Sequence, residues 1–245
     1  MRFAVISTGW KSWPWIQASL LSIAAQTYPD VDVCVVDDDS GDPQLGEFIT
    51  DYCMEHGWEF MLRSRHYGAL HNQVDAIRHL APAPDDVIVF VDCDGDTLKH
   101  PRVLERVADH YADGTKLIYF QYDSHPFSPT CSPSRPYPPE VVTAGSYREY
   151  ARTHGFAHNH LRTFRAELFY AMDESDFRDD QGAWLQTAAD AALMFPALEL
   201  ARGSVKFVDE VMLTYHSSNP LSDWRRDPRQ IDADHTTILG RQRKR

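Results

Sequence analysis

Residues 87–96 read Val87-Ile88-Val89-Phe90-Val91-Asp92-Cys93-Asp94-Gly95-Asp96 and hold the strongest buried-strand signal in the chain. Five consecutive apolar residues are typical of a β-strand that is covered on both faces, as in the parallel sheets of α/β proteins. Acidic residues follow the strand at once. A second stretch repeats this pattern, because the valine-rich residues 31–36 lead directly into Asp37-Asp38-Asp39-Ser40-Gly41-Asp42.

Outward from these two stretches, short apolar runs alternate with amphipathic segments over the first 120 residues. This alternation predicts βα units that build a mostly parallel sheet with helices on its faces. We expect strands at residues 3–7, 31–36, 58–62, 87–91 and 117–121, with helices at residues 14–26, 43–55, 70–80 and 101–111. Six prolines predict an irregular surface loop over residues 124–139. The later elements that we expect are a helix over 186–201, interrupted or kinked near Pro196, and strands at 205–207 and 211–215.

The composition narrows the class of protein. A length of 245 residues fits one domain with a C-terminal elaboration. The chain has 24 basic and 36 acidic residues, and the net charge of −12 would repel a nucleic-acid backbone. We find neither signal-peptide features nor an apolar stretch near the ~20 residues of a membrane span, so we expect a soluble, cytoplasmic protein. The basic end, residues 241–245, is expected to be a solvated terminus or to contact anionic lipid.

The two acidic clusters predict a metal site. The carboxyl ends of parallel strands meet at one edge of a sheet, so both clusters should face one crevice. Crowded carboxylates raise one another's pKa unless a cation intervenes, and hard oxygen ligands suit Mg²⁺ or Mn²⁺. We therefore place a divalent cation near Asp92 and Asp94; the alternative is a solvated acidic loop. An EF-hand is excluded, because its sixth and twelfth positions would be Thr97 and Val103.

Three blocks of sequence resemble the motifs of family 2 glycosyltransferases, in order and in spacing. They are Ser22-Ile23-Ala24-Ala25-Gln26-Thr27-Tyr28, Val35-Val36-Asp37-Asp38-Asp39-Ser40-Gly41-Asp42 and Val91-Asp92-Cys93-Asp94. The family pattern commonly reads S-I-x-x-Q-T-Y and V-V-D-D-G-S-x-D, so Asp39 replaces a usual Gly. Residues 68–72 are similar to the family's Gly and Asn loop, and residues 187–193, with Asp190, to its acidic acceptor-side helix.

The resemblance implies an α/β fold of the GT-A type, with a Rossmann-like, mostly parallel central sheet flanked by helices, in one domain with a C-terminal acceptor-side extension. Residues 1–120 would form the half that binds a nucleotide sugar, residues 121–220 the acceptor-side half and residues 221–245 a C-terminal tail. The implied activity is metal-dependent, inverting transfer of a sugar from a nucleotide diphosphate sugar to a hydroxyl acceptor of unknown identity. UDP is the favoured carrier and Mn²⁺ or Mg²⁺ the cofactor.

Two alternatives stay open at this point. Haloacid-dehalogenase-like, Mg²⁺-dependent phosphatases also place D-x-D after an apolar strand, with the first Asp as nucleophile. In that family the motif usually ends the first strand of the core, whereas about 90 residues precede it here. The other alternative is a sugar-nucleotide-binding module without catalytic activity.

The resemblance also implies roles for single residues. Thr8 would line the nucleotide pocket, Asp38 would accept a hydrogen bond from the base or ribose, and Asp92 would contact both the ribose and the metal. Asp94 would be the direct metal ligand, and His216, at the end of a late strand, would complete the metal shell.

Two further requirements are chemical. The diphosphate needs positive charge, and Arg63 and Arg65 follow the third predicted strand, where they could reach it. The acceptor hydroxyl must lose a proton to a carboxylate. We choose Asp190, at the apolar start of a helix, as this base; Asp179 and Asp180 are rival bases, and a favourable contact with the helix dipole is the alternative role of Asp190.

Overall fold

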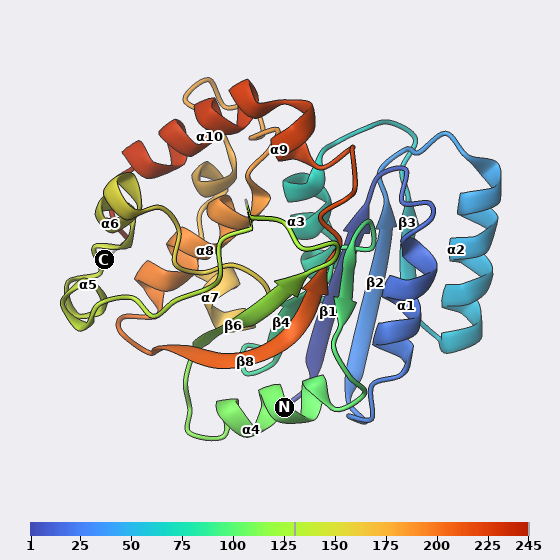
Figure 1. Cartoon of the computed structure of the whole chain (residues 1–245), viewed down its shortest axis with the longest axis horizontal. Coiled ribbons are helices and arrows are strands. Elements are labelled where there is room, and N and C mark those ends of the chain that lie inside the picture. The colour runs from blue at the N-terminus through green and yellow to red at the C-terminus, as the bar shows by residue number, and fades with distance from the viewer. Residues whose placement is uncertain (130, 245) are drawn as a thin grey trace.

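The computed structural model describes residues 1–129 and 131–244, which form one mixed α/β domain (Figure 1). The N-terminal half contains β1 (Phe3–Gly9), α1 (Ile16–Ala24), β2 (Val31–Asp37), α2 (Pro43–His56), β3 (Glu59–Leu62), α3 (Ala69–Leu80), β4 (Val87–Phe90), β5 (Asp96–Leu98), α4 (Val103–Tyr111) and β6 (Leu117–Ser124). The C-terminal half contains α5 (Pro139–Ala144), α6 (Tyr147–His154), β7 (Arg162–Arg165), α7 (Ala166–Tyr170), the 3₁₀-helix η1 (Glu174–Phe177), α8 (Ala189–Leu200), β8 (Val205–Tyr215), α9 (Asp223–Arg226) and α10 (Pro228–Gly240).

The strands within the described residues form one eight-stranded sheet in the order β3-β2-β1-β4-β7-β6-β8-β5. The pairings among β3, β2, β1 and β4 are parallel, as the alternation of strands and helices predicts. β7 runs antiparallel to β4 and to β6, whereas β6 and β8 are parallel. The carboxyl ends of β1, β2 and β4 therefore lie at one edge of the sheet.

Both faces of the central strands are buried, which explains their continuous apolar sequences. Along β1, Ala4 and Ile6 belong to a hydrophobic cluster that includes residues of α3 and α8. Phe3 and Val5, which point to the other face, belong to a second cluster with residues of α1, α2 and α4. Because neighbouring side chains on a strand point to opposite faces, a strand covered on both sides has no polar face to show.

Two expectations about the C-terminal half need correction. The late strands expected at 205–207 and 211–215 are one strand, β8, because irregular pairing with β6 near Gln121 accommodates the polar residues between them. The helix expected from residue 186 begins only at Ala189, because Ala188 has the left-handed φ of +53° that no helix continues through. Pro196 lies inside α8 and does not end it.

The basic C-terminal end is not a solvated terminus over the residues that the structure describes. Arg241 donates to the backbone oxygens of Asp176 and Arg178, and Arg243 pairs with Glu149. Lys244 forms an ion pair with Asp176 at 3.0 Å. These partners hold residues 241–244 against the domain and occupy the side chains of Arg241, Arg243 and Lys244. Among the described residues, no helix has both the length and the apolar character needed to cross a membrane.

Candidate active site

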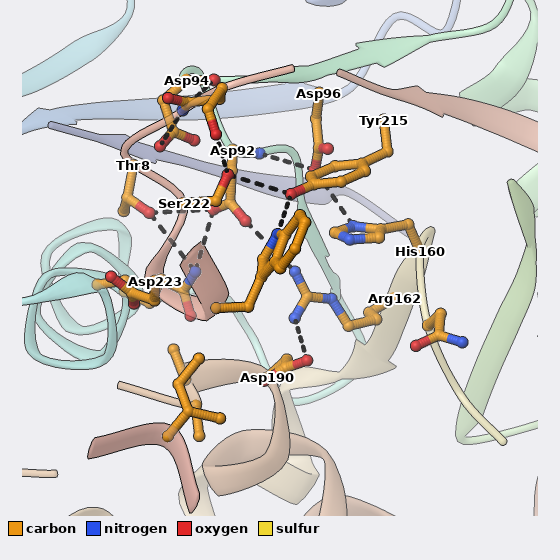
Figure 2. Close-up of a pocket in the computed structure, with 18 of the residues that line it drawn as sticks. Thr8, Asp92, Asp94, Asp96, His160, Arg162, Asp190, Tyr215, Ser222 and Asp223 are labelled. Carbon is orange, nitrogen blue, oxygen red and sulfur yellow. Dashed lines mark hydrogen bonds and ion pairs between the residues drawn. The ribbon is translucent and has the colours of Figure 1, made fainter. Parts of the chain in front are cut away.

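A cavity of about 590 Å³ opens at the carboxyl ends of β1, β2 and β4. Further wall residues come from the N-terminal ends of α3 and α8, from residues 131–160, from β7 and from the segment that carries α9 and α10. The cavity brings together five of the residues singled out from the sequence: Thr8, Asp38, Asp92, Asp94 and Asp190. Figure 2 shows four of these, Thr8, Asp92, Asp94 and Asp190, with Arg162 between Asp92 and Asp190.

Asp38 follows β2, and its carboxylate is bound by the loop before α3. It accepts hydrogen bonds from the backbone amides of Tyr67 at 2.7 Å and Gly68 at 2.8 Å. His66 Nδ1 lies 2.9 Å from the same carboxylate. The adjacent Asp39 has a φ of +57°, a region that glycine favours and aspartate tolerates, which explains how Asp39 can replace the usual Gly of the motif.

Asp92 is held by three side chains at the end of β4. Its Oδ1 accepts from Thr8 Oγ1 and from Gln73 Nε2, both at 3.1 Å, and its Oδ2 lies 3.4 Å from Arg162 Nη2. Burial and the charge of Asp96 raise the pKa of Asp92, although Arg162 opposes them. The position of Asp92 is therefore fixed before any ligand binds.

Asp94 is the acid whose negative charge is least offset by neighbouring groups. Burial raises its pKa well above the ordinary value, and the charges of Asp92, Asp96 and Asp223 add to the effect. Its carboxylate accepts a hydrogen bond from Asn219 Nδ2 at 3.3 Å, a neutral donor that leaves its charge unbalanced. In the same turn, Asp96 is 1% exposed and its Oδ1 has no hydrogen-bond partner.

These carboxyl groups raise one another's pKa, and a bound cation would offset their charge. Carboxylate oxygens are the hard ligands that Mg²⁺ and Mn²⁺ prefer, so the residues fit a divalent cation. In the described part of the chain, no three His, Cys, Asp or Glu side chains are grouped as a metal site. His216 does not line the cavity; its backbone amide donates to Gly95 at 2.7 Å, and its ring packs on His125. The set Asp92, Asp94 and His216 is thus not assembled around one point in this structure.

Asp190 lies in the first turn of α8, opposite the acids of the strand ends. Its Oδ1 accepts from the amide of Ala191 at 2.8 Å, and its Oδ2 lies 3.9 Å from Arg162 Nη1. Burial raises the pKa of Asp190, but the charges of Arg162 and His235 outweigh burial and hold the pKa below its ordinary value. The carboxylate is therefore ionised at neutral pH and is able to accept a proton.

The two rival bases lie elsewhere. Asp179 accepts from the backbone amides of Gln181 and Ala183, both at 2.9 Å, and so stabilises its own turn. Neither Asp179 nor Asp180 lines the cavity. Among the three candidate acids, the cavity therefore contains Asp190 alone.

The two arginines expected to meet a diphosphate do not line the cavity either. Arg63 turns back onto α3, where its Nη2 lies 2.7 Å from Asp75 Oδ2 and its Nε donates to Asn72. Arg65 is exposed and stacks on the ring of Tyr67 at 4.5 Å. A carboxylate on the facing helix explains the orientation of Arg63, and nothing in the predicted strand before it reveals that partner.

Arg162 and several other polar residues of the cavity were given no role from the sequence. Among them are Gln73, His160, Arg162, Asn219, Asp223 and Arg226. The one available signal for Arg162 is a charged residue at the start of a short strand-like run, Arg162-Thr163-Phe164-Arg165. Its role depends on β7 pairing with β4, which the local sequence does not reveal.

The mixed sheet, with a cavity and several acids at its strand ends, is the arrangement that the GT-A resemblance implies. The model of glycosyl transferase family 2 matches residues 5–172, more than half of the chain, so the chain belongs to this family and, through it, to the glycosyltransferases as a class. No curated protein matches the chain.

Solved structures resemble the whole chain, including the part beyond the family match. TarS of S. aureus has a TM-score of 0.64 at 17% identity, over 97% of this chain and 39% of that chain. Glucosyl-3-phosphoglycerate synthase of Mycobacterium tuberculosis has a TM-score of 0.60 at 16% identity, over 98% of this chain and 80% of that chain. The mannosyltransferase PcManGT from Pyrobaculum calidifontis has a TM-score of 0.58 at 17% identity, over 97% of this chain and 62% of that chain. At these identities the likeness shows the fold, and this chain spans about two fifths of the length of TarS.

Proposed function

We propose that the protein catalyses metal-dependent transfer of a sugar from a nucleotide diphosphate sugar, with UDP as the carrier, to a hydroxyl acceptor, with inversion at the anomeric carbon. One observation carries this proposal: Thr8, Asp38, Asp92 and Asp94 line one side of a cavity whose other side holds an ionised Asp190. A transferase that inverts needs a leaving-group site and a base on opposite sides of the sugar.

The donor side would bind the nucleotide through residues that already have fixed positions. Asp38 would accept from the base or ribose, Thr8 would line the nucleotide pocket, and Asp92 would meet the ribose. A divalent cation, Mn²⁺ or Mg²⁺, held by Asp94 and Asp92 would, when bound, neutralise the charge that develops on the departing diphosphate. The role of His216 as a further ligand stays a prediction, because its ring would have to enter the cavity.

Positive protein charge in the cavity comes from residues other than Arg65. Arg162 and Arg226 line the cavity, and Arg226 pairs with Asp223 at 3.1 Å. We assign the contact with the diphosphate to this pair of arginines, because both line the cavity and Arg65 does not.

Asp190 would act as the base. The acceptor oxygen forms a bond to the anomeric carbon while the bond from that carbon to the diphosphate oxygen breaks. The proton of the hydroxyl moves to the Asp190 carboxylate, which Arg162 and His235 keep ionised. A single displacement of this kind inverts the anomeric configuration.

The choice of UDP draws on solved structures of similar fold. TarS was solved with UDP-GlcNAc, and the M. tuberculosis synthase with UDP and Mn²⁺. PcManGT was solved with GDP-Man and Mn²⁺, so GDP is the competing carrier. The cytoplasmic location that we expect from the sequence remains a prediction.

A thermal-shift screen tests the proposal. UDP, UDP-glucose, UDP-GlcNAc and GDP-mannose are each added with and without Mn²⁺, and a selective ligand raises the melting temperature by mass action. We expect a UDP compound to stabilise the protein in Mn²⁺ and to be slowly hydrolysed there. Cleavage of an aryl phosphate with loss on Asp92→Asn would instead support the phosphatase, and binding without any turnover would support the non-catalytic module.

A further inference from the structure

The turn in front of Asp190 is held by a residue far away in the chain. Asp234, on α10, is 4% exposed, and its Oδ2 accepts three hydrogen bonds. The donors are the amide of Gln186 at 3.1 Å, the amide of Thr187 at 2.8 Å and the hydroxyl of Thr187 at 2.8 Å. Its Oδ1 accepts from Gln230 Nε2 at 2.9 Å. One buried carboxylate thus binds two consecutive residues of a turn that lies 47 and 48 positions earlier.

This turn leads directly into the first turn of α8. Ala188, the residue after Thr187, has a φ of +53° and a ψ of +37°, a conformation that costs an alanine on the order of 1 kcal/mol. Ala188, the N-cap residue of α8, makes no side-chain hydrogen bond to the amides that follow it. Such a conformation persists only where surrounding contacts impose it, and the two residues immediately before Ala188 are bonded to Asp234.

The loop before α3, which contains Gly68, packs against the opposite side of the turn. A Cβ atom at Gly68 would lie 3.2 Å from the backbone oxygen of Gln186. Gly68 also donates its amide to Asp38, the proposed nucleotide contact. The turn therefore lies between the loop before α3 and α10. Asp190 follows Thr187 by three residues.

α10 is itself firmly attached, which makes it a suitable anchor. Arg148 and Glu199 form an ion pair at 2.7 Å in which each side chain is 1% exposed. Arg148 Nη1 also donates to the backbone oxygen of Ile238 on α10 at 2.5 Å. Figure 1 shows α10 lying over α8 and beside α6.

We propose that Asp234 is a positioning residue, which fixes the turn at 186–188 and thereby aims the Asp190 carboxylate at the acceptor hydroxyl. This role rests on the proposed function of Asp190 as base. It also assigns a catalytic purpose to α10, which lies outside the residues that the family model matches. Displacing a catalytic group by about 1 Å is enough to cost on the order of 10²-fold in rate.

Two measurements on the full chain test this proposal. In Mn²⁺, the turnover and the KM of UDP-glucose and UDP-GlcNAc hydrolysis are measured, with water as the attacking hydroxyl. Amide hydrogen exchange is followed over residues 186–192. For Asp234→Ala we expect turnover about 10- to 100-fold lower, donor KM within about twofold, and faster exchange of the turn and the start of α8.

Matched variants separate positioning from general destabilisation. Asp232→Ala changes an exposed acid on the same helix and should alter neither measurement. Thr187→Val removes one of the three hydrogen bonds and keeps both amides, so it should give an intermediate effect even if Asp234→Ala folds poorly. Unchanged turnover together with faster exchange would overturn the proposal, as would unchanged exchange. If the unchanged protein hydrolyses neither donor, the proposed function fails, and the exchange comparison alone decides whether Asp234 holds the turn.

Discussion

The guanidinium of Arg162 lies 3.9 Å from the Asp190 carboxylate, and its other terminal nitrogen lies 3.4 Å from Asp92. One cation thus joins the proposed base to an acid at the end of β4, and Figure 2 shows it between them. Arg162 is 5% exposed, whereas the Asp190 side chain is 41% exposed, so water screens the ion pair with Asp190 in part. The charge of Arg162 lowers the pKa of the proposed base and also contributes to the position of Asp92.

Arg162→Gln should move the acid limb of the pH–rate profile to higher pH. The pKa of Asp190 lies below its ordinary value because Arg162, His235 and His158 outweigh burial, and Asp223 is the nearby acid that opposes them. Removing the largest favourable charge raises that pKa, so the base becomes protonated at a higher pH. Donor hydrolysis from pH 3 to 8 checks this, and Arg162→Lys should give a smaller shift. An acid limb that does not move in Arg162→Gln would show that Asp190 is not the titrating base.

Asp94→Asn should stabilise the protein without metal and abolish its stabilisation by Mn²⁺ and UDP. The pKa of Asp94 is raised by burial and by three neighbouring acids, so its ionised form destabilises the fold at neutral pH. Removing that charge should raise the melting temperature by about 2–4 °C, the effect of about 1 kcal/mol in a chain of this size. Differential scanning fluorimetry with and without ligand measures both changes. Asp109→Asn, at an exposed position on α4, is the control; equal ligand shifts in both variants would remove Asp94 from the metal site.

Much of the donor side could be predicted from the sequence, because its signals are local. Buried strands show as apolar runs at 31–36 and 87–91, and the rule that parallel strand ends converge brings Asp38 and Asp92 to one cavity. The acceptor side depends on contacts between distant residues. Arg162 meets Asp92 across 70 positions of sequence, and no local pattern encodes such a partner.

The orientation of single side chains could also not be predicted from the sequence. Arg63 has the right charge and follows the right strand, yet Asp75 on the facing helix binds it away from the cavity. Similarly, the start of α8 could not be predicted, because Ala188 has a left-handed φ and follows a turn that is bonded to Asp234 on α10. In both cases the deciding partner lies on another element.

Gly9→Ala should destabilise the protein and disturb the acidic turn after β4. A Cβ atom at Gly9 would lie 2.6 Å from Cys93 Sγ and 3.4 Å from Asp94 Cβ, so the D-x-D turn would have to shift. Overpacking of this kind costs about 1–3 kcal/mol. The variant should also weaken Mn²⁺-dependent UDP binding, which the thermal-shift assay reports. Gly9→Ala/Cys93→Ala removes the clashing sulfur and should recover part of both losses.

Gly46→Ala is the matched control for the Gly9→Ala and Gly9→Ala/Cys93→Ala variants. It lies within α2, where the nearest atom to an added Cβ is Leu62 Cδ1 at an ordinary 3.5 Å. Alanine is the better helix former, so this variant should be neutral or more stable by about 0.5–1 kcal/mol. If Gly9→Ala behaves like Gly46→Ala in urea unfolding, the close approach of β1 to Cys93 does not constrain the turn.

Arg148→Met should be among the most destabilising substitutions in the chain. Arg148 and Glu199 are each 1% exposed, and Glu199 also accepts from the backbone amide of Lys244 at 2.9 Å. Removing one partner of a buried ion pair leaves an uncompensated charge and costs about 3–5 kcal/mol. Replacing both charges avoids that penalty, so Arg148→Met/Glu199→Gln should recover at least half of the loss. Urea unfolding measures the free energy of unfolding of each variant. Arg102→Met is the control, because Arg102 is 71% exposed in its ion pair with Glu105, and this change should cost less than about 1 kcal/mol. Equal losses for the single and double variants would mean that the methylene packing and backbone contacts of Arg148, not its charge, hold α6 to α8 and α10.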